Sequence, residues 1–236
     1  MYILVFCILT ITISILIAKS VTSNLVKFII TTILLIIPIS EFVNQSIQYI
    51  LGKIVKPKLI PKMDFYNGIT HENATFVVIP TIIKTKEKVQ ELFRKLEVFY
   101  LANKSENLYF AVLGDCSESD FQEEEFDKEV IEEGLEQVEN LNKKYAKVEF
   151  PIFHFIYRER QYNNAEEKYL GWERKRGLLT QFNEYILKHE KNKFKVNTIN
   201  QDELPKIKYI ITLDSDTDLV LNTACELIGA MAHILN

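Results

Sequence analysis

Two long runs of apolar residues occupy the first quarter of the chain. Residues 2–18 carry no charge and consist mainly of Ile, Leu, Val, Thr and Phe, and a second apolar stretch runs from residue 25 to about residue 43. A helix needs roughly 20 apolar residues to cross a bilayer core, and Pro38 in the second stretch is tolerated in such helices. We therefore expect two membrane spans at about residues 2–18 and 25–43, followed by an interfacial segment that reaches residue 54.

Basic residues are distributed unevenly around these two runs. Four lysines follow the second run, at positions 53, 56, 58 and 62, whereas two lie at the short loop between the runs, at positions 19 and 27. Lysine and arginine accumulate on the cytoplasmic side of membrane proteins. We expect residues 1–56 to form a multi-pass anchor in the cell membrane and residues 57–236 to face the cytoplasm.

From residue 57 onward, short apolar segments alternate with amphipathic segments. The apolar segments predict strands at residues 76–79, 108–113, 148–157 and 209–213. Helices are expected from about residue 85, through the acidic stretch 118–139 to about residue 145, and around residues 178–186. This alternation predicts an α/β fold with a mostly parallel sheet, right-handed crossovers and helices on both faces.

Polar residues follow each predicted strand at its carboxyl end. They are Thr81, Asp115, Arg158 and the pair Asp214 and Asp216. Ligands of parallel sheets bind beyond the carboxyl ends of the strands. We therefore expect these side chains to share one rim of the sheet.

Asp214 and Asp216 are the strongest chemical signal on this rim. On an extended chain, residues i and i+2 point to the same side about 6.6 Å apart, so both carboxylates can reach one divalent ion. A hard cation such as Mg²⁺ or Mn²⁺, with a diphosphate completing its shell, fits two carboxylates better than zinc does.

Asp214 and Asp216 have three alternative interpretations. Asp and Ser are common at strand ends simply as turn residues. An EF-hand is excluded because Leu219 occupies the loop position that requires glycine. A phosphatase of the haloacid dehalogenase type is disfavoured because Asp218 stands where Thr or Val is expected.

A basic cluster precedes the last predicted strand. Arg174, Lys175 and Arg176 lie between Gly171 and Gly177 and fall in the first turns of a predicted helix. Cations at a helix N-terminus oppose the helix dipole by roughly 0.3–1 kcal/mol each, unless an anion binds nearby. A bound diphosphate would reverse that sign. The alternative is an exposed basic turn on a helix that begins earlier, near residue 164.

Charge and composition argue against a nucleic-acid partner and against a metal site built from cysteine and histidine. The net charge of −4 argues against a nucleic-acid partner. The three cysteines, at positions 7, 116 and 225, and the four histidines show no metal-ligand spacing. We expect reduced cysteines, as in a cytosolic domain.

The motifs together resemble a known family. Val-Val-Ile-Pro-Thr at residues 77–81, the strand ending in Asp115, the segment 174–183 and Leu-Asp-Ser-Asp-Thr at 213–217 resemble the nucleotide-sugar half of processive GT-A glycosyltransferases. With the Trp-centred motif at 171–177, they are more closely similar to the glycosyltransferase domain of cyclic β-1,2-glucan synthases. The likeness covers about residues 57–236.

This resemblance implies a partial GT-A fold that binds UDP-glucose and a divalent metal, Mg²⁺ or Mn²⁺, and uses a glucan acceptor. It implies polymerisation of β-1,2-linked glucose at the cytoplasmic face of the membrane. It implies that Asp214 and Asp216 bind the metal. The residues implied in donor binding are Thr81 at the nucleotide cleft, Asp115 at the uracil end, and Arg174, Lys175 and Arg176 at the diphosphate or donor sugar.

Members of this family are much longer than 236 residues. We therefore expect the chain to be an incomplete synthase that lacks the general base for the acceptor hydroxyl. A separately encoded remainder of the synthase is one partner compatible with this expectation, and the sequence alone does not decide it. Its last strand is expected at a sheet edge. The alternative is a non-catalytic, membrane-anchored remnant, or half of a split protein that assembles with a partner.

Overall fold

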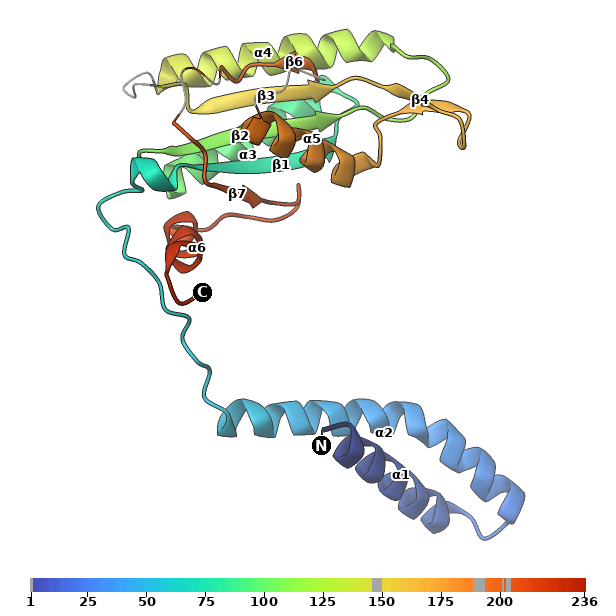
Figure 1. Ribbon diagram of the computed structural model, residues 1–236. Helices are drawn as coiled ribbons and strands as arrows, with labels where there is room; N and C mark the ends of the chain where they lie inside the picture. The colour runs from blue at the N-terminus through green and yellow to red at the C-terminus, as the bar shows by residue number, and fades with distance from the viewer. Residues whose placement is uncertain (1, 146–149, 189–193, 201, 203–204) are drawn as a thin grey trace. The chain divides into compact units, whose positions relative to one another are not determined.

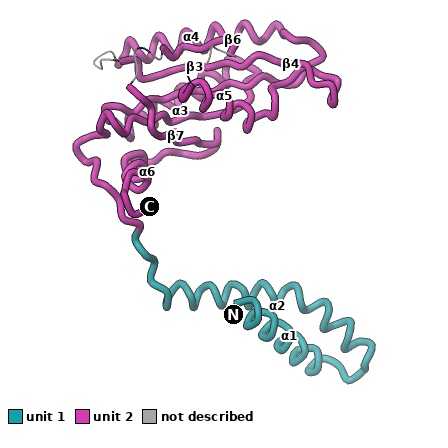
Figure 2. The backbone as a smooth tube through the Cα atoms, in the orientation of Figure 1, with its two compact units in different colours: residues 1–59 teal, residues 60–236 magenta. Residues whose placement is uncertain are grey.

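The computed structural model describes residues 2–145, 150–188, 194–200, 202 and 205–236. The chain divides into two compact units, residues 1–59 and 60–236 (Figure 2).

The first unit is a hairpin of two helices, α1 (Tyr2–Val21) and α2 (Leu25–Ile54) (Figure 1). Both are long and apolar enough to cross a membrane, judged by length and composition. The buried residues of α1 are small ones spaced four apart, Thr10, Ser14 and Ala18, which allows close approach of a neighbouring helix. The helix α2 continues without interruption through the segment expected to be interfacial.

The second unit is built on a five-stranded sheet in the order β6-β3-β2-β1-β7. The strands are β1 (Thr75–Ile82), β2 (Leu108–Asp115), β3 (Phe153–Arg158), β6 (Phe194–Asn197) and β7 (Tyr209–Thr212). The strands β1, β2, β3 and β7 run parallel, and β6 pairs antiparallel with β3. The predicted mostly parallel sheet is confirmed, and β7 lies at one edge as expected.

Helices cover both faces of this sheet (Figure 1). One hydrophobic cluster joins the sheet to α3 (Lys86–Ala102), α4 (Glu125–Lys144) and α6 (Thr223–Ala232). A second cluster on the opposite face includes Leu178 and Phe182 of α5 (Arg174–Lys188). Successive residues of β1 and β2 enter opposite clusters, such as Phe76 and Val77 of β1, so these central strands are apolar on both sides.

Local sequence signals set the starts of two helices. The Thr85 hydroxyl accepts a hydrogen bond from the backbone N–H of Lys88 at the start of α3. A reciprocal capping box between Glu124 and Asp127 opens α4. Both caps satisfy N–H groups that have no partner within the helix.

Several short elements differ from the sequence expectations. The predicted strand 148–157 begins only at Phe153, and its residues 148–149 lie outside the described residues. The chain then forms a hairpin of β4 (Gln161–Asn163) and β5 (Lys168–Leu170), so the alternative of a helix beginning near residue 164 is wrong. The elements β6, α6 and a short 3₁₀ turn, His71–Asn73, were not predicted.

The packing of α4 on the sheet generates a stability prediction. A Cβ atom at Gly134 would lie 2.3–2.8 Å from ring atoms of Phe155, which is fully buried. Replacing Gly134 by Ala should therefore destabilise the fold by about 1–2 kcal/mol, because overpacking outweighs the roughly 1 kcal/mol gained in helix propensity. Urea unfolding of the detergent-solubilised chain, followed by circular dichroism, measures the change.

The matched control is Glu136→Ala, an exposed position on the same helix. That variant should change the free energy of unfolding by no more than about 0.5 kcal/mol. A Gly134→Ala protein as stable as the control would contradict the close contact between α4 and Phe155.

Candidate functional site

The polar residues predicted on one rim do lie there together. Asp115 is the last residue of β2 and Arg158 the last residue of β3, while Asp214 follows the end of β7. In the parallel pairing of β1 with β2, Ile82 is opposite Asp115, so Thr81 reaches the same edge. The carboxyl ends of four neighbouring strands therefore form a single rim.

A cavity of about 480 Å³ opens at this rim. Its lining residues are Pro80, Thr81, Ile82, Asp115, Arg174, Lys175, Leu178, Asp214, Ser215 and Asp216. Its volume falls within the range typical of small-molecule sites. A second cavity of about 470 Å³ lies beside α6, and none of the predicted site residues lines it.

Six of the seven predicted site residues line the rim cavity, and Arg176 does not. The Arg176 side chain is 80% exposed, and its Nε atom lies 2.6 Å from a carboxylate oxygen of Glu173. The structure thus brings Arg174 and Lys175 to the cavity and leaves Arg176 at the solvent surface.

Residues 214–218, here called the acidic turn, follow β7. The strand itself ends at Thr212, and the Thr217 N–H donates to the Asp214 carbonyl at 3.0 Å. The prediction that Asp214 and Asp216 lie on an extended segment is therefore wrong. Both side chains are nonetheless exposed and line the same cavity, so the turn keeps the two carboxylates together.

Residues 174–176, here called the cation turn, begin α5, and Arg174 and Lys175 of this turn form the opposite wall of the cavity. The Lys175 ammonium makes an ion pair with the Asp214 carboxylate. Arg174 lies with its Nη2 atom 3.4 Å from a carboxylate oxygen of Glu118. The pairing of Lys175 with Asp214 shows that the basic and acidic walls face each other across the cavity.

A buried ion pair lies behind the cavity. Arg158 donates from Nε to Asp115 Oδ1 at 2.9 Å and from Nη2 to Asp115 Oδ2 at 2.6 Å. Their side chains are only 2% and 3% exposed. Asp115 Oδ1 also accepts the Cys116 N–H at 2.9 Å. Asp115 thus lines the cavity, yet both of its carboxylate oxygens already have partners inside the protein.

Arg158 also holds the backbone that leads into the cation turn. Its Nη1 atom donates to the Trp172 carbonyl at 2.7 Å, and its Nη2 atom donates to the Arg174 carbonyl at 2.9 Å. Glu173 and Arg174 both adopt left-handed backbone conformations, with φ of 47° and 49°. Such conformations are strained in residues other than glycine and persist where the surroundings fix them.

The two glycines of the Trp-centred motif are required by close approach. A Cβ at Gly171 would lie 2.2 Å from both Arg158 Nη2 and Asp115 Oδ1, and a Cβ at Gly177 would lie 1.8 Å from the Trp172 carbonyl oxygen. Neither position has room for a side chain. The motif at residues 171–177 is therefore shaped by the buried ion pair and by the turn that leads into α5.

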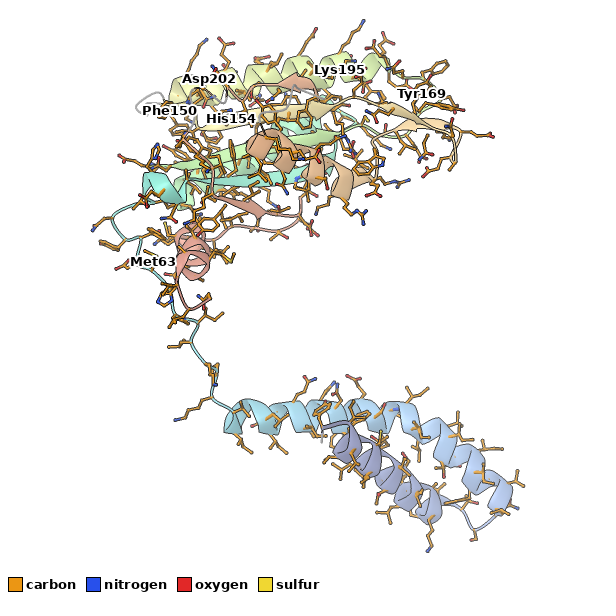
Figure 3. All side chains as sticks on the ribbon, viewed as in Figure 1. Met63, Phe150, His154, Tyr169, Lys195 and Asp202 are labelled. Carbon is orange, nitrogen blue, oxygen red and sulfur yellow. The ribbon has the colours of Figure 1, made fainter. Side chains whose placement is uncertain are left out.

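A second buried arginine ties α4 to this rim. Arg160 makes an ion pair with Asp127 and donates from Nε to the Ser117 carbonyl at 2.7 Å. Burial opposes ionisation of Asp127, but hydrogen bonds from Arg160, from the Glu124 N–H and from the Tyr157 hydroxyl hold the pKa of its carboxyl below the ordinary value. Ser119, which follows Ser117 closely in the chain, forms an isolated antiparallel β-bridge with Tyr169 of the β4-β5 hairpin. Tyr169 is labelled in Figure 3.

Sequence reasoning missed two contributions to the site. Arg158 was expected on the rim, but its pairing with Asp115 joins residues 43 positions apart and has no local signal. Lys95 of α3 was not considered, although its Nζ atom donates to the Ser215 carbonyl at 2.8 Å. It lies beside the apolar residues of α3 and cannot be told by spacing from an ordinary helix-surface lysine.

The donor set of the site is sparse. Within the described ranges of the chain, no group of three or more His, Cys, Asp or Glu side chains is placed to hold a metal ion. Any divalent cation bound by Asp214 and Asp216 would need further ligands from a bound molecule or from water.

Comparison with known proteins shows a similarity to a bacterial glucan synthase. The chain is 34% identical over 209 residues to the cyclic beta-(1,2)-glucan synthase NdvB of Rhizobium meliloti (strain 1021). The match covers 88% of this chain but only 7% of that protein. No protein-family model matches the chain.

The buried ion pair gives a prediction that separates a structural role of Asp115 from a ligand-binding one. Asp115→Asn removes the charge that compensates the buried Arg158, so the free energy of unfolding should fall by about 3 kcal/mol or more. Chemical unfolding of the solubilised chain without any ligand measures this change.

Asp120→Asn, an exposed position after the same strand, is the control and should shift stability by less than about 0.5 kcal/mol. Unchanged stability of Asp115→Asn would mean that the pair with Arg158 contributes little, and that Asp115 is free to serve a ligand.

Proposed function

We propose, on the premise that this chain is a relative of the cyclic β-(1,2)-glucan synthases, that its rim cavity binds UDP-glucose together with a divalent cation. The observation that carries the proposal is the single cavity in which Asp214 and Asp216 face Arg174 and Lys175. Homology to a glucan synthase supports a glycosyltransferase-like function. The donor, the metal and the GT-A assignment are the parts that we add.

The acidic turn fits Mg²⁺ or Mn²⁺ by its chemistry. Asp214 and Asp216 offer carboxylate oxygens, which these hard cations prefer, and both side chains are exposed at the cavity. When bound, such a cation neutralises negative charge on the diphosphate of the departing UDP. Two protein carboxylates are sufficient because substrate phosphates and water commonly complete the shell of Mg²⁺.

The cation turn supplies the complementary charge. In the proposed complex, Arg174 and Lys175 stabilise the diphosphate, and Lys175 exchanges its pairing with Asp214 for a phosphate oxygen. A diphosphate at the start of α5 also removes the unfavourable interaction of these cations with the helix dipole. Arg176, which pairs with Glu173 outside the cavity, has a lesser part in this scheme.

The other rim residues have supporting roles. Thr81 lies half-buried in the cavity lining, where its hydroxyl can contact the nucleotide. For Asp115 we favour a positioning role over direct contact with uracil, because Arg158 already occupies both carboxylate oxygens. Its effect on the donor is then exerted through the Arg158 contacts to the cation turn.

The wider activity belongs to the same proposal. The chain spans about 7% of the length of its relative, so glucan polymerisation and a glucan acceptor are inferred for it by analogy. We propose that α1 and α2 hold the chain in the cell membrane, with residues 60–236 on the cytoplasmic side where UDP-glucose is available. The lysines that follow α2 support this orientation.

Metal-dependent donor binding is the direct test. UDP-glucose titrated into the detergent-solubilised chain should bind with Mn²⁺ present and lose most of its affinity in EDTA. Asp214→Asn and Asp216→Asn should each lower the affinity with Mn²⁺ by about tenfold or more, because each removes a charged ligand. Isothermal titration calorimetry measures both effects.

Asp202→Asn is the matched control, since Asp202, which is labelled in Figure 3, is exposed and is not one of the cavity-lining residues. Binding that is indifferent to Mn²⁺ and to both aspartates would refute the proposal. Transfer of glucose to a glucan would show that the chain completes the reaction, and binding without transfer would assign it the donor step alone.

The placement of the three cations gives a second, sharper prediction. Lys175→Met should weaken UDP-glucose binding by about tenfold, because a charge-assisted contact to phosphate is lost inside the cavity. Arg176→Met should weaken it by less than about threefold, because the exposed Arg176 charge acts through solvent. The same calorimetric titration compares the two variants.

The comparison is matched, since the two variants remove one positive charge each from adjacent positions. Equal losses for Lys175→Met and Arg176→Met would indicate a diffuse electrostatic effect in place of a defined cation wall.

A further inference from the structure

Lys95 of α3 contacts both the backbone and a side chain of the acidic turn. Its Nζ atom donates to the Ser215 carbonyl at 2.8 Å and lies 3.2 Å from Asp218 Oδ1. The side chain is only 17% exposed, whereas that of Asp218 is 78% exposed. Its Nζ atom also lies 5.6 Å from the ring centroid of the buried Phe99. The position of the Lys95 side chain is therefore fixed by its contacts with Ser215, Asp218 and Phe99.

The acidic turn lies between two buried residues, and its own aspartates are exposed. Leu213 and Leu219, which flank it, are 8% and 3% exposed and belong to the hydrophobic core. Between them, Asp214, Asp216 and Asp218 are all exposed; the first two line the cavity, and Asp218 pairs with Lys95. Three neighbouring carboxylates repel one another. The Lys95 ammonium beside the turn therefore favours the conformation that keeps the three aspartates close together.

The hydrogen bond from Lys95 to the Ser215 carbonyl lies between the two proposed metal ligands. Ser215 lies between the two proposed metal ligands, so its carbonyl belongs to the peptide that links Ser215 to Asp216. A hydrogen bond to that oxygen fixes the orientation of the peptide and restrains the Cα–Cβ directions on either side. Groups that hold metal ligands in this way affect metal affinity although they do not touch the metal.

We propose that Lys95 is a positioning residue that fixes the acidic turn so that Asp214 and Asp216 face the cavity together. It acts through the Ser215 carbonyl and the Asp218 carboxylate and does not touch the ligand. The proposal deepens the function proposed above and rests on it for the metal, although the effect on the turn itself is independent of any ligand.

A role of Lys95 as a bare charge makes the opposite prediction for the metal. A cation close to a divalent site repels the ion, so removing the charge alone would tighten metal binding. Removing a positioning contact loosens the turn and weakens metal binding. The sign of the change therefore distinguishes the two roles.

Hydrogen–deuterium exchange of the detergent-solubilised full chain, without ligand, tests the effect on the turn. Lys95→Met keeps the apolar stem against Phe99 but removes the ammonium. Amides of residues 213–219 should exchange about tenfold faster in this variant, while those of the sheet strands stay unchanged. Lys95→Arg, which retains a donor and a charge, should recover part of the protection.

Lys88→Met is the matched control on the same helix. Lys88 pairs with Glu91 of the same helix, so exchange at residues 213–219 should equal that of the unaltered protein. Exchange in Lys95→Met that equals the control overturns the proposal. Faster exchange across the whole of α3 also overturns it, because that result assigns Lys95 a general role in folding.

Calorimetric titration of UDP with Mn²⁺ tests the consequence for the site. Lys95→Met should lower the Mn²⁺-dependent affinity by about tenfold, and Lys88→Met should not change it. Tighter binding in Lys95→Met overturns the positioning role. If the unaltered protein shows no Mn²⁺-dependent binding of UDP, the proposed function is wrong, while the exchange experiment still decides whether Lys95 fixes the turn.

Discussion

The buried pair of Asp115 and Arg158 is the interaction on which the rest of the rim depends. It joins the last residues of β2 and β3, and the same guanidinium holds the carbonyls of Trp172 and Arg174. Removing two charges from water is costly, and only good geometry with further hydrogen bonds offsets the cost. Here two guanidinium nitrogens bind the carboxylate, and Nη1 and Nη2 also donate to two backbone carbonyls, so the geometry meets that condition.

The shape of the cation turn follows from this pair. Gly171 must lack a side chain because Arg158 and Asp115 occupy the space beside it. Glu173 and Arg174 then take left-handed conformations that no glycine relieves, and the hydrogen bond from Arg158 to Arg174 holds them there. The strain is located beside the cavity, which is where proteins commonly tolerate it. A fixed turn can present Arg174 and Lys175 without reorganisation.

The sequence was sufficient for the parts of the fold that depend on periodicity. The four parallel strands, the helices α3, α4 and α5 and the common rim were all predicted, because each follows from local spacing and from the direction of parallel strands. The hairpin β4-β5 and the strand β6 were missed because they have three or four residues each and no periodic signal. The pairing of Asp115 with Arg158 and the contact of Lys95 with Ser215 depend on tertiary packing, which spacing does not encode.

Charge balance connects the two walls of the cavity. In the described structure, Lys175 pairs with Asp214, and Arg174 lies 3.4 Å from Glu118, so each cation that lines the cavity has an acidic neighbour. In the proposed complex, a divalent cation would balance the two aspartates, and the diphosphate would balance Arg174 and Lys175. Both walls would then be neutralised after the Lys175 and Asp214 side chains have separated. Because Arg158 and Lys95 fix the backbone behind each wall, this exchange requires side-chain movement and leaves the sheet unchanged.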